Sequence, residues 1–225
     1  MQHLEIFMTP DRFGHFANVN TLTSDGIARA DRIGLVDSGL AHLMVVTDLR
    51  DAAGLFIDRM RTGRVLTLLR DPVEQALSDY HYRQSLGPDN PLGLSMDTPL
   101  SEFAKSADLP TNAIVKGLTN ITDSTLVTLA HLRAAKLILE NYVVVGLLDE
   151  FDESAAYFHD YFGWDFSDHL CVRNFQAARD NRNDHEHLDA QSVEHQTISD
   201  RNWADVELYR FARTLFQKRT KPTVG

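Results

Sequence analysis

Two short apolar runs constrain the fold of this chain more than any other feature. The runs "RVLTLL" (64–69) and "YVVVGLL" (142–148) have the length of strands and are apolar on both faces. Strands of that kind are typical of parallel sheets, which helices cover on both sides. We therefore expect Val65–Leu69 and Val143–Leu147 to be buried strands of one parallel sheet.

Helical segments alternate with these runs. Helical spacing or capping residues predict helices in residues 24–35, 48–61, 72–84, 99–106, 123–141, 152–164 and 199–219. Residues 165–198 are rich in His, Asp, Asn and Arg, and we expect them to be irregular. Helices alternating with buried strands predict an α/β fold. At 225 residues, we expect one domain that spans residues 1–225.

Composition excludes several classes of protein. The net charge of -10 disfavours wide contact with nucleic acid, so an anionic ligand would need a local pocket. A single cysteine, Cys171, excludes an internal disulfide framework and a multi-cysteine zinc site. No apolar run approaches the ~20 residues that a membrane span requires, and the N-terminus lacks signal-peptide features. The compartment and the oligomeric state stay open.

The stretch "RVLTLLRDPVEQALSDYHY" (64–82) indicates an anion site. Arg70 ends the first strand, where open α/β sheets bind ligands, and Pro72 suits the first turn of a helix. Ser78 lies two turns into that helix, so a phosphate group could contact both Arg70 and Ser78. The spacing leaves open a plainer alternative, in which Ser78 is an ordinary helix serine and Arg70 pairs with a neighbouring acid, Asp71, Glu74 or Asp79.

This stretch also resembles a known element. "LLRDPVEQALSDYHY" (68–82) is similar to the segment that binds the 3'-phosphate of the cosubstrate in sulfotransferases, with Arg70, Pro72, Ser78 and Tyr80 on its positions. Weaker resemblances to the carbohydrate-sulfotransferase branch extend over most of residues 18–217. Their segments are "VNTLTSDGIARA" (19–30), "HLRAAKLILEN" (131–141), "NYVVVGLLDEFDESAAYFHDYFGW" (141–164) and "NWADVELYRFARTLF" (202–216), the last with an Asn…Asp-x-x-Leu-Tyr pattern.

The resemblance implies a fold and a reaction. The fold would be a P-loop-like three-layer α/β/α arrangement around a parallel sheet. The reaction would move a sulfuryl group from 3'-phosphoadenosine 5'-phosphosulfate to a hydroxyl-bearing acceptor such as a carbohydrate. Arg70 and Ser78 would bind the 3'-phosphate of this cosubstrate, and no metal ion is expected.

Two departures from the family pattern limit this expectation. Many members have an arginine where this chain has Gln75. The family's loop for the 5'-phosphosulfate, Pro-Lys-x-Gly followed by two Ser or Thr residues, is not found, and the nearest string is "KGLT" (116–119). We therefore expect an N-terminally incomplete domain without its first βα unit, which by itself transfers no sulfate. The alternative is a non-catalytic remnant that binds a nucleotide or a partner, while a kinase-like phosphotransferase would lack its loop lysine.

Sulfuryl transfer also needs a base that accepts the acceptor's proton. His42 precedes the first strand, roughly where some relatives place a catalytic histidine, and His15 is the second candidate. For both, the plainer alternative is a non-catalytic histidine.

Other polar clusters favour structural roles. His185, His187 and His195 lie among carboxylates, yet solvated polar sequence or a mobile lid fits them better than a metal site. The acidic residues at the start of the helix after the second strand, Glu150, Asp152 and Glu153, suit helix capping better than acid–base chemistry.

Overall fold

The protein is a mixed α/β structure that is mostly helical and has a small parallel sheet of two strands. This computed structural model describes residues 8–11, 14–17, 19–41, 43–46, 49–56, 63–122, 124–163 and 187–220. The α/β class expected from the sequence is thereby confirmed. His42, Cys171 and His185 lie outside the described residues.

The chain divides into two compact units, one holding β1 to α3 and the other β3 to α11. In the first unit, β1 (Met8–Asp11) pairs with β2 (Gly14–Ala17) in an antiparallel hairpin. Three helices follow, α1 (Ser24–Arg32), α2 (Leu35–Ser38) and α3 (Leu49–Gly54). They enclose a small core of Ile27, Ala30, Leu35 and Leu55. The hairpin and α2 were not predicted.

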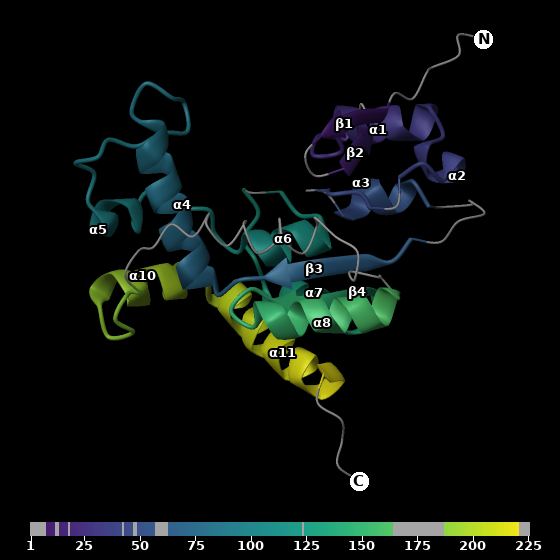
Figure 1. The fold of residues 1–225 in the computed structure, drawn as a ribbon. Coiled ribbons are helices and arrows are strands. Elements are labelled where there is room, and N and C mark those ends of the chain that lie inside the picture. The colour runs from purple at the N-terminus through teal and green to yellow at the C-terminus, as the bar shows by residue number, and fades with distance from the viewer. Residues whose placement is uncertain are drawn as a thin grey trace. The chain divides into compact units, whose positions relative to one another are not determined.

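The second unit contains the parallel strand pair, formed by β3 (Val65–Leu69) and β4 (Val143–Leu147). Its helices are α4 (Pro72–Leu86), α5 (Leu100–Phe103), α6 (Ala113–Thr119), α7 (Leu129–Tyr142), α8 (Phe151–Phe162), α10 (Val193–Arg201) and α11 (Trp203–Thr220). Figure 1 shows α4 continuing from the carboxyl end of β3. Both strands therefore occupy the residues predicted for them.

The two strands differ in how deeply they are buried. All five residues of β4 are buried, and β4 contacts α7, α8 and α11. In β3 only Leu69 is buried, and the four residues before it are half-buried. The expectation of two buried strands is confirmed for β4 and wrong for most of β3. Within the described residues both strands are edges of a two-stranded sheet, so the difference comes from the helices α7, α8 and α11 that pack on β4.

The C-terminal region differs from its prediction. Residues 199–219 were expected to form one helix after an irregular segment, but α10 and α11 are separate helices that meet at Asn202. The Ser192 side chain accepts a hydrogen bond from the backbone of His195 and thereby caps α10. The irregular segment was therefore predicted too long, because a local cap at Ser192 starts a helix in polar sequence.

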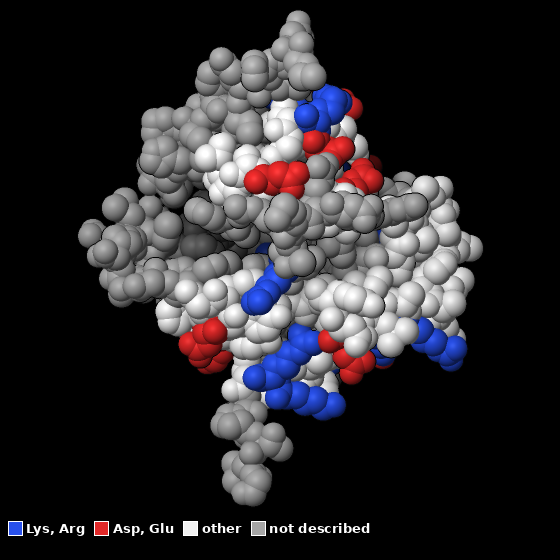
Figure 2. Space-filling model, turned by 90° about the vertical axis from the view of Figure 1, so that its right-hand side faces the viewer, with Lys and Arg blue, Asp and Glu red and all other residues white. Residues whose placement is uncertain are grey.

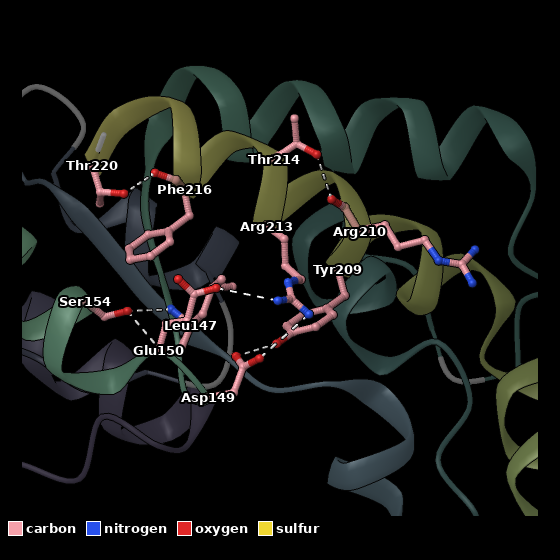
Figure 3. A network of polar contacts seen from close by, with 10 residues as sticks. All are labelled: Leu147, Asp149, Glu150, Ser154, Tyr209, Arg210, Arg213, Thr214, Phe216 and Thr220. Atoms are coloured by element: carbon pink, nitrogen blue, oxygen red, sulfur yellow. Dashed lines mark hydrogen bonds and ion pairs between the residues drawn. The ribbon is translucent and has the colours of Figure 1, made fainter. Parts of the chain in front are cut away.

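Close packing between β4 and α8 depends on Gly146. The hydroxyl of Ser154, on α8, accepts a hydrogen bond from the Leu147 backbone N–H at 2.8 Å and donates one to the Leu147 carbonyl at 3.0 Å (Figure 3). A methyl group at Gly146 would lie 2.6 Å from Cζ of Phe158 and 2.9 Å from Cβ of Ser154. Only glycine therefore lets α8 approach the strand this closely.

Gly146→Ala is expected to lower the free energy of unfolding by about 1–3 kcal/mol, the usual cost of overpacking a core. Urea denaturation measures the change. Gly117→Ala in α6 is the matched control, because a methyl group there meets no atom within 4 Å and alanine favours a helix. Equal stabilities of the two variants would contradict the packing described here.

Candidate functional site

The ends of β3 and β4 form an edge rich in charged side chains. The backbone N–H of Leu148 donates to the carbonyl of Leu69 at 2.7 Å, which aligns the two strand ends. We call this the carboxyl edge and define it by the charged residues just after the strands, which are Arg70 and Asp71 after β3 and, beyond Leu148, Asp149 and Glu150 after β4. The predicted position of Arg70 at a strand end is therefore confirmed.

Asp71 occupies the start of α4. Its carboxylate accepts hydrogen bonds from the backbone N–H groups of Val73 at 2.9 Å and Glu74 at 3.3 Å. Pro72 follows Asp71 at the first position of the helix. An anion at this site would find these N–H groups already engaged, so it would depend on side chains rather than on the helix terminus.

Arg70 lies beside an acidic residue of α4. Its guanidinium Nη2 is 3.7 Å from Oε2 of Glu74, and both side chains are mostly buried. The pairing of Arg70 with Glu74 is one that the sequence left open, whereas Asp79 instead binds Arg83 at 2.8 Å. Ser78 is half-buried and lies one turn beyond Glu74 on the same side of α4, while Arg70 precedes the capping Asp71.

Glu74 has a second partner. The Nδ1 atom of His187 lies 2.9 Å from Oε1 of Glu74, although the His187 side chain is largely exposed. His187 was weighed as a metal ligand in the sequence. No group of three or more His, Cys, Asp or Glu side chains among the described residues could hold a metal ion. In the described residues His187 instead contacts Glu74 of α4.

Side chains from α11 reach the carboxyl edge. The Tyr209 hydroxyl donates to Oδ1 of Asp149 at 2.6 Å, and Arg213 lies between Asp149 and Glu150 (Figure 3). The N···O distances from Arg213 are 3.9 Å to Asp149 and 3.6 Å to Glu150, longer than a hydrogen bond. Burial of Tyr209, followed by its contact with Asp149, raises the pKa of Tyr209 above its usual range. Tyr209 therefore remains a donor that orients Asp149.

The acidic start of α8 is only partly a cap. Asp152 and Glu153 lie in the first turn, as the capping interpretation expects. The Glu150 side chain makes no capping hydrogen bond and lies beside Arg213 instead. Sequence reasoning missed both α11 residues at this edge, because Tyr209 is 60 positions from Asp149 and no local pattern joins them.

The two candidate bases cannot be placed at this edge. His42 lies outside the described residues. His15 is in β2, where its backbone pairs opposite Pro10, and its side chain lies outside the described part of the structure. Both therefore remain predictions.

Away from the edge, a buried pair of helix caps joins α6 to α11. Oδ1 of Asn112 accepts hydrogen bonds from the backbone N–H groups of Ala204 at 2.9 Å and Asp205 at 3.2 Å. In return, Oδ1 of Asn202 accepts from the backbone N–H of Asn112 at 2.8 Å. Asn112 has the left-handed backbone conformation, with φ of 52°.

Asp205, on α11, caps the start of α6 in the same way. Its carboxylate accepts hydrogen bonds from the backbone N–H groups of Ile114 at 3.0 Å and Val115 at 2.9 Å, at the start of α6. We call Asn112, Asn202 and Asp205 the cross-cap. Lys116, the lysine of the "KGLT" string, lies within α6 and is buried. The string closest to a phosphate loop is therefore part of a helix.

Comparison with protein-family models, curated proteins and solved structures gave no match to this chain. No described helix is both long enough and apolar enough to cross a membrane.

Proposed function

We propose that this protein is sulfotransferase-like and binds 3'-phosphoadenosine 5'-phosphosulfate at the carboxyl edge, with Arg70 and Ser78 on the 3'-phosphate. The observation that supports this proposal is the position of Arg70 at the end of β3, just before the capping Asp71, with Ser78 about two turns into the helix that follows. Under this proposal the strand pair and its helices belong to a P-loop-like three-layer α/β/α fold.

A phosphate group can bind to both Arg70 and Ser78 only if the Glu74 side chain moves away from Arg70. Glu74 lies between Arg70 and Ser78 along α4, and its Oε2 atom is buried with no hydrogen-bond partner among the described residues. The separation of 3.7 Å between Arg70 and Glu74 is longer than a hydrogen bond. Because a charge-assisted hydrogen bond to phosphate is stronger, Arg70 would turn from Glu74 to the ligand.

The proposed reaction is an in-line transfer. An acceptor hydroxyl oxygen forms a bond to sulfur while the bond from sulfur to the 5'-phosphate oxygen breaks, which releases adenosine 3',5'-bisphosphate. The hydroxyl proton passes to a base, for which His42 is the candidate. On the face drawn in Figure 2, blue Lys and Arg side chains lie next to red Asp and Glu side chains. The net charge of the whole chain, -10, favours a small or weakly charged acceptor over a long polyanion.

Arg70→Ala is expected to weaken binding of adenosine 3',5'-bisphosphate about 10- to 150-fold, because it removes a charge-assisted contact worth about 1.5–3 kcal/mol. Isothermal titration calorimetry measures the dissociation constant directly. Ser78→Ala should weaken binding less, because it removes a neutral donor worth about 1 kcal/mol.

Arg64→Ala is the matched control, because Arg64 precedes the opposite end of the same strand. Its dissociation constant should equal that of the wild type. The same affinity in the wild type and in Arg70→Ala would remove the proposed function.

A second candidate function is a non-catalytic remnant that binds a nucleotide or a partner without chemistry. The observation that favours it is the acidic Glu74 between the two proposed phosphate contacts. Gln75 beside it is exposed and supplies no positive charge. This chain by itself is expected to transfer no sulfate, so the two candidates differ only after a genuine 5'-phosphosulfate loop has been added at its N-terminus. The extended chain should then transfer labelled sulfate to a panel of hydroxyl acceptors if the catalytic candidate is right, and should transfer none if the non-catalytic candidate is right.

A further inference from the structure

The carboxyl edge presents a second arginine that the sequence did not single out. Arg213 comes from α11, at the far end of the chain from Arg70, and its side chain is 47% exposed. Its two acidic neighbours, Asp149 and Glu150, lie 3.9 Å and 3.6 Å away. These distances leave the guanidinium N–H groups able to donate to a new acceptor.

Other arginines of the same region are bound more tightly. Arg219 donates to the backbone carbonyls of Val143 at 2.8 Å and Glu140 at 2.5 Å, and so holds the junction of α7 and β4. Arg201 donates to the carbonyls of Ala104 and Ser106, both at 2.7 Å. These two have structural roles, whereas Arg213 has loose ion pairs at the edge where a ligand is proposed.

Charge balance explains why a second cation matters there. The edge and the first turn of α4 carry four carboxylates, Asp71, Glu74, Asp149 and Glu150, against the positive charges of Arg70 and Arg213. A bisphosphate bound through Arg70 alone would face an excess of negative charge. It would gain from any guanidinium that leaves its carboxylates for the ligand.

We propose that Arg213 is a second cationic contact for the phosphate groups of the nucleotide, and that Glu150 competes with the nucleotide for it. This inference rests on the proposed function, since it concerns the same ligand. In the unliganded protein Arg213 lies between Asp149 and Glu150, and in the complex it binds phosphate oxygen. Tyr209 keeps Asp149 in place through its hydroxyl, so the shorter of the two ion pairs, with Glu150, is the one that sets the competition.

The test uses adenosine 3',5'-bisphosphate as the probe and calorimetry on the full chain. Arg213→Ala is expected to weaken binding about tenfold, through loss of a charge-assisted contact. Glu150→Gln is expected to tighten binding up to about fivefold, because it removes an exposed ion-pair partner of modest strength. In an Arg213→Ala background, Glu150→Gln should no longer tighten binding, because the group it releases is absent.

Arg210→Ala is the matched control. Arg210 lies on the same helix, three residues before Arg213, and pairs with Glu207 on the exposed surface. It should leave the dissociation constant unchanged, so a general effect of charge on α11 would appear in both variants.

The outcomes separate this inference from the proposed function. If Arg70→Ala weakens binding but Arg213→Ala and Glu150→Gln do not change it, the inference is overturned and the proposed function stands. If the bisphosphate does not bind to the wild type, or if Arg70→Ala binds it equally, the proposed function fails first. Since Glu150→Gln keeps Arg213 and its helix intact, tighter binding in that variant cannot come from a folding defect.

Discussion

Asn112→Ala is expected to lower the free energy of unfolding by about 3–7 kcal/mol, measured by urea denaturation at neutral pH. The substitution leaves the backbone N–H groups of Ala204 and Asp205 buried without their acceptor. Each such loss costs roughly 1–3 kcal/mol. Alanine also tolerates the left-handed conformation at this position less well than asparagine, which adds about 1 kcal/mol.

Asn120→Ala is the matched control for the backbone. Asn120 ends α6, has the left-handed conformation with φ of 51°, and takes no part in the cross-cap. Its replacement by alanine should lower the free energy of unfolding by only about 1 kcal/mol, the cost of alanine in the left-handed conformation. Asn112→Gly should lie between the two, because glycine accepts the conformation but supplies no acceptor. If Asn112→Ala were no more destabilising than Asn120→Ala, the cross-cap would contribute nothing to stability.

Local signals in the sequence predicted the strands and the start of α4. Val65–Leu69 and Val143–Leu147 are apolar on both faces and have strand length, and both are strands. Pro72, after the capping Asp71, marks the start of α4. Each of these signals lies within a few consecutive residues, so it can be recognised in a single sequence.

Features that join distant parts of the chain were not predicted. The cross-cap links Asn112 to Asn202 across 90 positions. The break between α10 and α11 lies at Asn202, and nothing near it in the sequence indicates that this residue bonds to Asn112. The hairpin in the first unit escaped notice because its strands have four residues each and the first contains Pro10. Arg213 was missed for a related reason, since helical spacing in α11 does not show which side faces the carboxyl edge.

The cross-cap also makes stability depend on pH. Burial of Asp205 raises its pKa from 3.8 to about 6, although its hydrogen bonds from Ile114 and Val115 and the charge of Lys116 act in the opposite direction. The folded state therefore holds a proton on Asp205 that the unfolded state releases. As pH rises from 3.8 to about 6, the free energy of unfolding should fall by about 3 kcal/mol on account of this group and then level off.

Asp205→Asn isolates this effect, because the amide is a neutral side chain of the same shape. At pH 4 the variant should be less stable than the wild type, since its amide oxygen can replace only part of the acceptor set for Ile114 and Val115. Between pH 4 and pH 7 the difference should shrink by about 3 kcal/mol, because only the wild type buries a charge as pH rises. Asp200→Asn, on the exposed surface of α10, should show no such change relative to the wild type. A difference between wild type and Asp205→Asn that stays constant from pH 4 to pH 7 would mean that Asp205 is ionised throughout, with the N–H groups of α6 outweighing the cost of its burial.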